Sequence, residues 1–220
     1  MKTPFLLVNV KTYRKGSGDD LLDLAYSCEK IADMMDRNIA MAVQNADINR
    51  VASRVDIPIL AQHADSDGYG SNTGSDIIPT LQHNGASGVI INHSEDQVPL
   101  DEIKDVVKKA RKHSMASIVC VDEPSLAERV KDEKPSFIAY EPPELIGGST
   151  SVASAKPELI EEVRERGETR KTKILVGAGV KGSTDVEKAL ELGSKGVLVA
   201  SGAVKADDPE QAVRELVEPM

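Results

Sequence analysis

The sequence predicts an α/β protein folded as a closed (β/α)8 barrel, with eight parallel strands inside a ring of outer helices. Short runs of branched aliphatic residues recur along the whole chain. Most of these runs are continuous rather than alternating, as in parallel strands that are buried on both faces. Helix-like stretches separate them, and 220 residues divided among eight units gives about 27 residues per unit, close to the ~30 of a βαβ unit.

The eight expected strands are short apolar runs. An open doubly wound sheet is the competing architecture, but eight units would make such a sheet wide. No long linker or low-complexity segment interrupts the pattern, so we expect residues 1–220 to form a single barrel domain. The strands are expected at Phe5–Val8, Ile39–Val43, Ile57–Ala61, Gly88–Ile91, Ala116–Val121, Phe137–Tyr140, Lys173–Val176 and Gly196–Ala200.

The stretches between these strands have helical periodicity. In Pro99–His113, for example, Ile103 and Val107 fall on one face and lysines lie opposite. Gly85 and Gly193 are expected to end helices as C-terminal caps. The helices are expected at Asp19–Arg37, Asp47–Val55, Asp76–Asn84, Pro99–His113, Pro124–Lys131, Pro157–Arg166, Ser183–Leu192 and Pro209–Val217.

Composition excludes several classes of protein. The net charge of −9 disfavours broad nucleic-acid binding, although a small anionic substrate needs only a few local amides and one lysine. No apolar run is long enough for a membrane helix or a signal peptide, so we expect a cytoplasmic protein without a membrane partner. Cys28 and Cys120 fit neither a disulfide framework nor a zinc site, and no metal-ligand cluster is apparent.

In a barrel of this kind, chemistry lies where strands end and the following loops begin. Asn9 and Lys11 follow the first strand, and alternation predicts that they point to the same side. Lys11 would then place a positive charge at the barrel mouth, the alternative being a solvated lysine at a loop start.

His93 follows the fourth strand and precedes Ser94 and Glu95. We expect it at the opening of a short helical turn, where the helix N-terminus lowers the histidine pKa and favours a neutral ring. A surface or core histidine is the alternative. His63 is a weaker candidate because the acidic residues after it indicate a turn, and His83 and His113 are expected at helix C-terminal ends.

Glu141 closes the sixth strand, so burial is expected to raise its pKa toward that of a general base. The segment 142–148 after it has prolines at one end, glycines at the other and an apolar tip, which predicts a lid rather than an ordinary exposed loop. Glycine-rich turns follow strands seven and eight, where barrels often bind phosphate. Gly177–Gly182 also matches G-x-G-x-x-G, but too little chain follows for a dinucleotide-binding fold.

Taken together, these residues resemble the triosephosphate isomerase family, and they occur in family order across nearly the whole chain. Gln62, Cys120 and Glu123 also match family positions. The short barrel, the lid and the seventh loop are most similar to the archaeal branch. The residues that carry the resemblance are Asn9–Lys11, Asn92–Glu95, Tyr140–Pro142, the segment 142–148 and the glycine-rich loops at 177–182 and 199–203.

The resemblance implies a TIM barrel and an aldose–ketose isomerase of glycolysis and gluconeogenesis. Glu141 would move a proton between neighbouring carbons of dihydroxyacetone phosphate through an enediolate, giving D-glyceraldehyde 3-phosphate. Neutral His93 would hydrogen-bond the carbonyl oxygen, Lys11 would stabilise the enediolate, and Asn9 would line the pocket. The reaction moves no net electrons to an acceptor, so no cofactor or metal is expected.

The resemblance also implies that backbone amides of Ile146, Gly179, Ala200 and Ser201 hold the substrate phosphate. Gly179 departs from the commoner family pattern, which has a serine there. The segment Thr73–Ser75 resembles a loop that plugs into a neighbouring subunit, implying a homodimer or homotetramer. Two other functions stay open: a phosphate-binding barrel enzyme acting on a larger phosphorylated substrate, and a catalytically silent scaffold, which has no reason to retain Lys11, His93 and Glu141 together.

Overall fold

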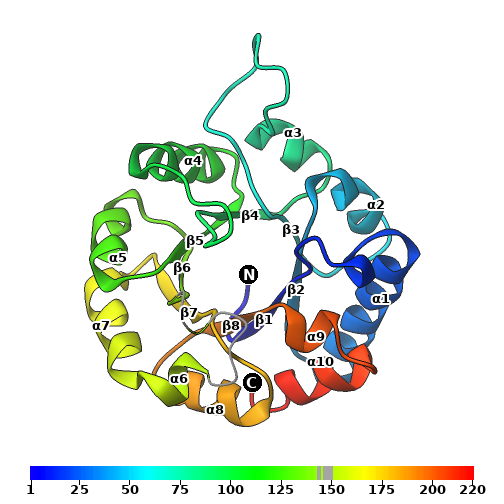
Figure 1. The fold of residues 1–220 in the computed structure, drawn as a ribbon. Helices are drawn as coiled ribbons and strands as arrows, with labels where there is room; N and C mark the ends of the chain where they lie inside the picture. Colours follow the sequence, from blue (N-terminus) through cyan, green and yellow to red (C-terminus); the bar gives the residue numbers. More distant parts are fainter. Residues whose placement is uncertain (143–144, 146–150) are drawn as a thin grey trace.

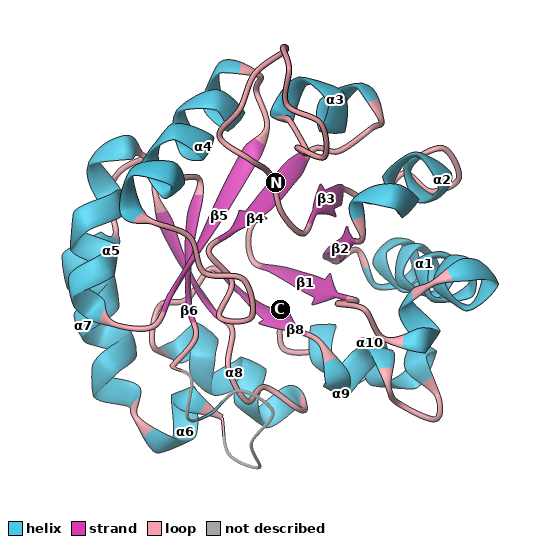
Figure 2. Ribbon diagram, turned by 45° about the horizontal axis from the view of Figure 1, so that its top comes forward, coloured by secondary structure: helices cyan, strands magenta, loops and turns pink. Residues whose placement is uncertain are grey.

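A computed structural model of the chain, which describes residues 1–142, 145 and 151–220, confirms the predicted barrel. In this part of the chain, eight parallel strands pair in sequence order, and β1 also pairs with β8 to close the sheet on itself. Figure 1 looks into the barrel and shows the helices as an outer ring, and the turned view in Figure 2 shows the strands inside that ring.

The observed strands agree closely with the expected ones. The third strand begins two residues later than expected, because Pro58 has no N–H to donate to the ladder and contributes only its carbonyl, which accepts from Met41 N at 3.0 Å. The strands are β1 (Phe5–Asn9), β2 (Asn38–Val43), β3 (Ile59–Ala61), β4 (Gly88–Ile91), β5 (Ala116–Val121), β6 (Phe137–Tyr140), β7 (Lys173–Val176) and β8 (Gly196–Val199).

The helices begin and end within a few residues of the expected positions. Gly85 and Gly193 follow helix ends with positive φ, as the C-cap expectation requires. Two short helices, α6 and α9, were not expected. The helices are α1 (Gly18–Met35), α2 (Ile48–Ala52), α3 (Ile78–His83), α4 (Leu100–Lys112), α5 (Pro124–Val130), α6 (Val152–Ala155), α7 (Pro157–Gly167), α8 (Ser183–Glu191), α9 (Ser201–Val204) and α10 (Pro209–Val217), with 3-10 turns η1 (Arg14–Gly16), η2 (Asn45–Asp47) and η3 (Lys131–Glu133).

The strands are buried on both faces, which explains their continuous apolar sequences. One set of side chains fills the inside of the barrel and includes Phe5, Leu7 and Leu175. The alternate set, which includes Leu6 and Val8, packs outward against the helices. Two apolar layers therefore fix the register of each strand, because a shift by one residue would exchange the inner and outer sets.

The loop of residues 65–77, between β3 and α3, projects beyond the ring of helices in Figure 1. At its tip the Tyr69 side chain is highly exposed. Its base is braced: Asp76 N donates to Asp65 Oδ2 at 2.6 Å, and Lys109 of α4 donates to the carbonyls of Ser66 and Asp67. The loop is thus a supported projection. Among the described residues, no helix combines the length and apolar character that a membrane crossing requires.

Closure between β8 and β1 depends on Gly196. Its φ of +145° is one that residues with a side chain rarely adopt, and a Cβ at this position would collide with the backbone of Phe5.

We therefore expect Gly196→Ala to lower the free energy of unfolding by at least about 2 kcal/mol, measured by urea denaturation. Gly68→Ala is the matched control, because no atom lies near the Cβ it would add, and it should change stability by less than about 0.5 kcal/mol. Equal effects of the two substitutions would contradict this account of barrel closure.

Candidate active site

A cavity of about 230 Å³ lies at the C-terminal ends of the strands. Its lining comes from the ends of β1, β4, β6, β7 and β8, and it includes Lys11, His93 and Glu141. Residues that are far apart in the sequence therefore meet at one end of the barrel, as the strand-end rule predicts.

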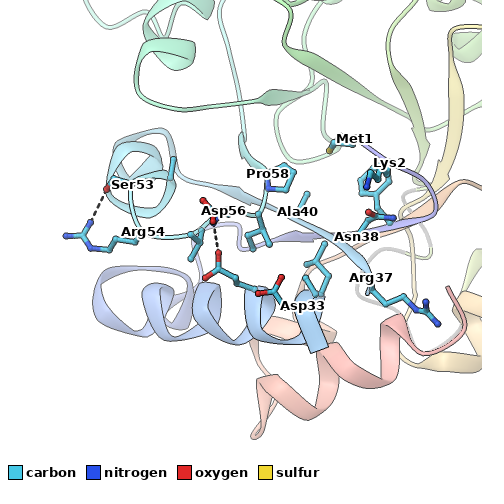
Figure 3. Close-up of a pocket in the computed structure, with 17 residues that line it drawn as sticks. Met1, Lys2, Asp33, Arg37, Asn38, Ala40, Ser53, Arg54, Asp56 and Pro58 are labelled. Carbon is cyan, nitrogen blue, oxygen red and sulfur yellow. Dashed lines mark hydrogen bonds between the residues drawn. The ribbon is translucent and has the colours of Figure 1, made fainter. Parts of the chain in front are cut away.

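A larger cavity of about 730 Å³ lies at the opposite end, between the starts of the first three strands and the ends of α1 and α2 (Figure 3). It is lined by charges of both signs. Arg37 and Arg54 lie at opposite ends of the view rather than converging on one point, and Asp33 and Asp56 lie between them. We assign the chemistry to the smaller cavity, because His93 and Glu141, whose pKa values are both altered, line it.

Glu141 follows β6 and is only 2% exposed. Burial raises the pKa of its carboxyl from 4.5 to about 7, and the Cys120 thiol and the charge of Lys11 act in the opposite direction. Within the described part of the chain, Glu141 Oε2 has no hydrogen-bond partner. A buried carboxylate with a free oxygen and a pKa near neutrality has the properties of a general base.

Gly177, the first residue after β7, makes room for the Glu141 carboxyl. A Cβ at position 177 would lie 2.5 Å from Glu141 Cγ and 2.6 Å from Oε1, closer than atoms can approach. The position of the carboxyl therefore depends on a glycine 36 residues further along the chain (177 − 141). Sequence reasoning assigned this glycine only to a phosphate-binding turn.

His93 faces Glu141, with 3.7 Å between Nε2 and Oε2. Its other nitrogen, Nδ1, accepts a hydrogen bond from Glu95 N at 3.1 Å. An amide can only donate, so Nδ1 carries no proton and a neutral ring has its proton on Nε2, toward the cavity. Burial is the main cause that lowers the pKa of His93, followed by the charge of Lys11.

The predicted cause of the low histidine pKa was wrong. His93 opens a short turn, as predicted, closed by a 2.8 Å hydrogen bond from Asp96 N to His93 O, but no helix begins there. The direction of the pKa shift nevertheless agrees with the expectation, because desolvation of the ring has the same sign.

Lys11 lines the cavity, and its Nζ pairs with Glu95 Oε1 at 2.7 Å. Simple strand alternation does not place it there, because Lys11 has a φ of +48°. Instead, Lys11 N donates to Asn9 Oδ1 at 3.0 Å, and Gln62 Nε2 donates to both Asn9 Oδ1 and Lys11 O at 3.1 Å. Asn9 is 4% exposed and is not part of the cavity lining, so it contacts the Lys11 backbone rather than the cavity.

The turns after β7 and β8 contribute Gly179, Ala200 and Ser201 to the cavity wall, as expected. Ser201 begins α9, whose first amides have no partner within the helix and are available to an anion. Ile146, the fourth residue predicted to bind phosphate, lies outside the described residues, as does most of the predicted lid. Of that segment, Pro142 and Leu145 are described, and Leu145 N donates to Pro142 O at 3.0 Å.

Sequence reasoning missed several residues that shape this site. Glu95 was quoted beside His93 but given no role, and Gln62 was noted only as a family position. Glu123 lies at the start of α5 and does not line the cavity, whereas Cys120 contacts Glu141 from inside the barrel. The only sequence feature that could have identified these residues is their position near the end of a buried strand. Contacts in the folded structure are needed to distinguish them from other loop residues.

Comparison with known proteins gives a consistent result. The family model for triosephosphate isomerase matches residues 4–218. The chain is 39% identical to triosephosphate isomerase of Methanothermus fervidus over the full length of both proteins. It is 42% identical to that of Cenarchaeum symbiosum, covering 100% of this chain and 99% of the relative, and 39% identical to that of Methanosarcina acetivorans, covering 99% of each.

The raised pKa of Glu141 has a consequence for stability. Because the folded protein favours the protonated carboxyl, Glu141 contributes to the free energy of unfolding. This contribution is complete below pH 4.5 and is lost as the pH rises through about 7. The difference corresponds to about 3 kcal/mol.

We therefore expect the stability of Glu141→Gln, relative to the unsubstituted protein, to rise by up to about 3 kcal/mol between pH 4.5 and pH 8 in urea denaturation. Glu128→Gln, on the exposed surface of α5, is the control and should show no such rise. A difference for Glu141→Gln that is constant with pH would show that its carboxyl titrates normally.

Proposed function

The chain belongs to the triosephosphate isomerase family and interconverts dihydroxyacetone phosphate and D-glyceraldehyde 3-phosphate, and we propose that Glu141, His93 and Lys11 carry out this reaction. One observation carries the assignment: the free oxygen of Glu141 lies 3.7 Å from Nε2 of His93 at the wall of a cavity that Lys11 also lines.

Glu141 is the proposed base. It removes a proton from C1 of dihydroxyacetone phosphate, leaving an enediolate, and returns a proton to C2 to complete the aldose. A carboxylate with a pKa of about 7 binds a proton more strongly than an exposed glutamate and still releases it near neutral pH. Acid–base catalysis by a positioned group contributes typically ~10²–10⁴-fold to a rate.

His93 is the proposed hydrogen-bond donor to the substrate oxygens. Because Nδ1 accepts from Glu95 N, the ring donates through Nε2. A neutral donor is close in pKa to an enediol oxygen, and it moves a proton between the two oxygens without the charge separation that an imidazolium would require.

Lys11 is the proposed electrostatic partner of the enediolate. Its side chain is 12% exposed, so its charge acts in a partly desolvated site where electrostatic interactions are strong. Glu95 holds its Nζ at 2.7 Å, and the Asn9–Gln62 contacts hold its backbone. In this proposal Asn9 therefore holds the backbone of Lys11 in place.

The phosphate is proposed to bind the amides of Gly179, Ala200 and Ser201, together with the amide of Ile146. The positive end of α9 and the Lys181 side chain, which also lines the cavity, would favour a dianion there. A larger phosphorylated substrate is not favoured, because the cavity of about 230 Å³ suits a three-carbon ligand and the relatives carry the triosephosphate isomerase name.

The same proposal extends to the assembly and place of the enzyme. We infer that the enzyme is a cytoplasmic homodimer or homotetramer of the archaeal type. It would act in glycolysis and gluconeogenesis, using only its own side chains and backbone amides and no cofactor. The projecting loop of residues 65–77, with its braced base and exposed Tyr69, supports subunit contact. Its segment Thr73–Ser75 would enter the neighbouring subunit.

Glu141→Gln keeps the shape of the side chain and removes the base. We expect kcat to fall at least about 10³-fold in a coupled assay with D-glyceraldehyde 3-phosphate. Glu128→Gln, on α5 away from the cavity, should retain full activity. Full turnover by Glu141→Gln would remove the base from the proposal.

Thr73→Arg adds bulk and charge to the exposed projecting loop and should reduce the mass of the assembly. Light scattering coupled to gel filtration measures this effect across a range of concentrations. Thr184→Arg, at an exposed position of α8, is the matched control and should leave the mass unchanged. An assembly that survives Thr73→Arg unaltered would place the subunit contact elsewhere.

A further inference from the structure

His63, which follows β3, has no part in the proposed reaction, yet its ring joins two loops at the barrel mouth. Nδ1 lies 2.9 Å from Asp96 Oδ2, and Nε2 lies 3.3 Å from Asp65 Oδ1. A carboxylate only accepts hydrogen bonds, so each ring nitrogen can donate to its carboxylate when it carries a proton, and the protonated ring pairs with both. The contact with Asp96 links the loop after β3 to the turn after β4.

Asp96 belongs to the same short turn as His93. Asp96 N closes that turn on His93 O at 2.8 Å, and the preceding amide, Glu95 N, donates to Nδ1 of His93 at 3.1 Å. Any shift of Asp96 therefore moves the amide that fixes the tautomer of His93. The Asp96 side chain is 61% exposed, so His63 supplies a restraint that packing does not.

The other side of His63 is anchored to the barrel. Asn45 Nδ2 donates to His63 O at 3.0 Å and to Asp76 Oδ2 at 2.8 Å. Asp65 and Asp76 are themselves joined by the 2.6 Å hydrogen bond at the base of the projecting loop. Asn45, Asp65 and Asp76 thus restrain His63, and His63 can transmit that restraint to Asp96.

The contact is too exposed to matter much for global stability. The His63 side chain is 31% exposed, and ion pairs and hydrogen bonds at such sites contribute about 0–1 kcal/mol. Orientation in an active site is more sensitive, since a displacement of about 1 Å can reduce a rate by ~10²-fold. The contact is therefore better placed to control geometry than to hold the fold together.

We propose that His63 is a positioning residue for this isomerase: through Asp96 it fixes the turn of residues 93–96, and so holds His93 with its Nε2–H directed at the substrate. The proposal rests on the proposed role of His93 and adds a residue outside the cavity lining to the catalytic apparatus. It assigns His63 no contact with substrate.

The test compares two substitutions of similar size. His63→Leu removes both ring nitrogens, whereas His63→Asn keeps an amide N–H close to the place of Nδ1. We expect kcat of His63→Leu to fall about 10- to 100-fold with KM within about twofold, and His63→Asn to recover most of the loss. His113→Leu is the control, because His113 at the end of α4 also contacts a side chain of a neighbouring element, Gln82 Oε1 of α3 at 3.1 Å, but lies away from the cavity.

Asp96→Ala breaks the same contact from the other side and replaces His63→Leu if that variant fails to fold. Because both residues act through one contact, the double variant should lose no more activity than the worse single variant. In ¹⁵N NMR spectra, His93 of the unsubstituted protein should show one tautomer with the proton on Nε2, and in His63→Leu a mixture of tautomers.

The inference is overturned if His63→Leu and Asp96→Ala retain kcat within twofold, if His63→Asn and His63→Leu lose activity equally, or if the losses add in the double variant. These results are distinguishable from failure of the proposed function. That failure would appear as full activity of Glu141→Gln, whatever the His63 variants do.

Discussion

The exclusion of water from the Glu141 carboxyl is the constraint on which the rest of the site depends. The group is 2% exposed, and one of its oxygens has no hydrogen-bond partner in the part of the chain that the structure describes. Such an arrangement is normally destabilising. Here the absence of a side chain at Gly177 leaves space for the carboxyl, the Cys120 thiol hydrogen-bonds to it, and the charge of Lys11 limits the rise of its pKa. A proton taken from a substrate would satisfy the free oxygen.

Polar contacts then join the loops after β1, β3 and β4, which carry or support Lys11 and His93. Gln62, after β3, holds Asn9 and Lys11 after β1, and Lys11 pairs with Glu95 after β4. His63 reaches Asp96 in the same turn as His93. The loops lie at the surface, where side-chain positions are usually poorly defined. Here these contacts and the buried strands beneath the loops fix the positions of the reacting side chains.

Most of the fold was predictable from the sequence, because burial on both faces makes each strand a continuous apolar run. β4, β5, β6 and β7 begin and end at the predicted residues. The strand-end positions of His93 and Glu141 were predictable for the same reason. The positive φ of Lys11 and the space that Gly177 leaves for the Glu141 carboxyl were not predictable, since each depends on contacts between loops that are distant in sequence. His93 opens a short turn as predicted, but that turn does not continue into a helix, so burial rather than a helix N-terminus is the main cause of its lowered pKa.

The pairing of β1 with β8 also constrains how the chain acquires its shape during synthesis. β1 leaves the ribosome early, but its second neighbour begins only at Gly196. Until then the nascent sheet has two open edges, and its inner apolar side chains face water. Since such edges pair readily with other chains, the last strand and α10 act as the step that removes an aggregation hazard as well as completing the barrel.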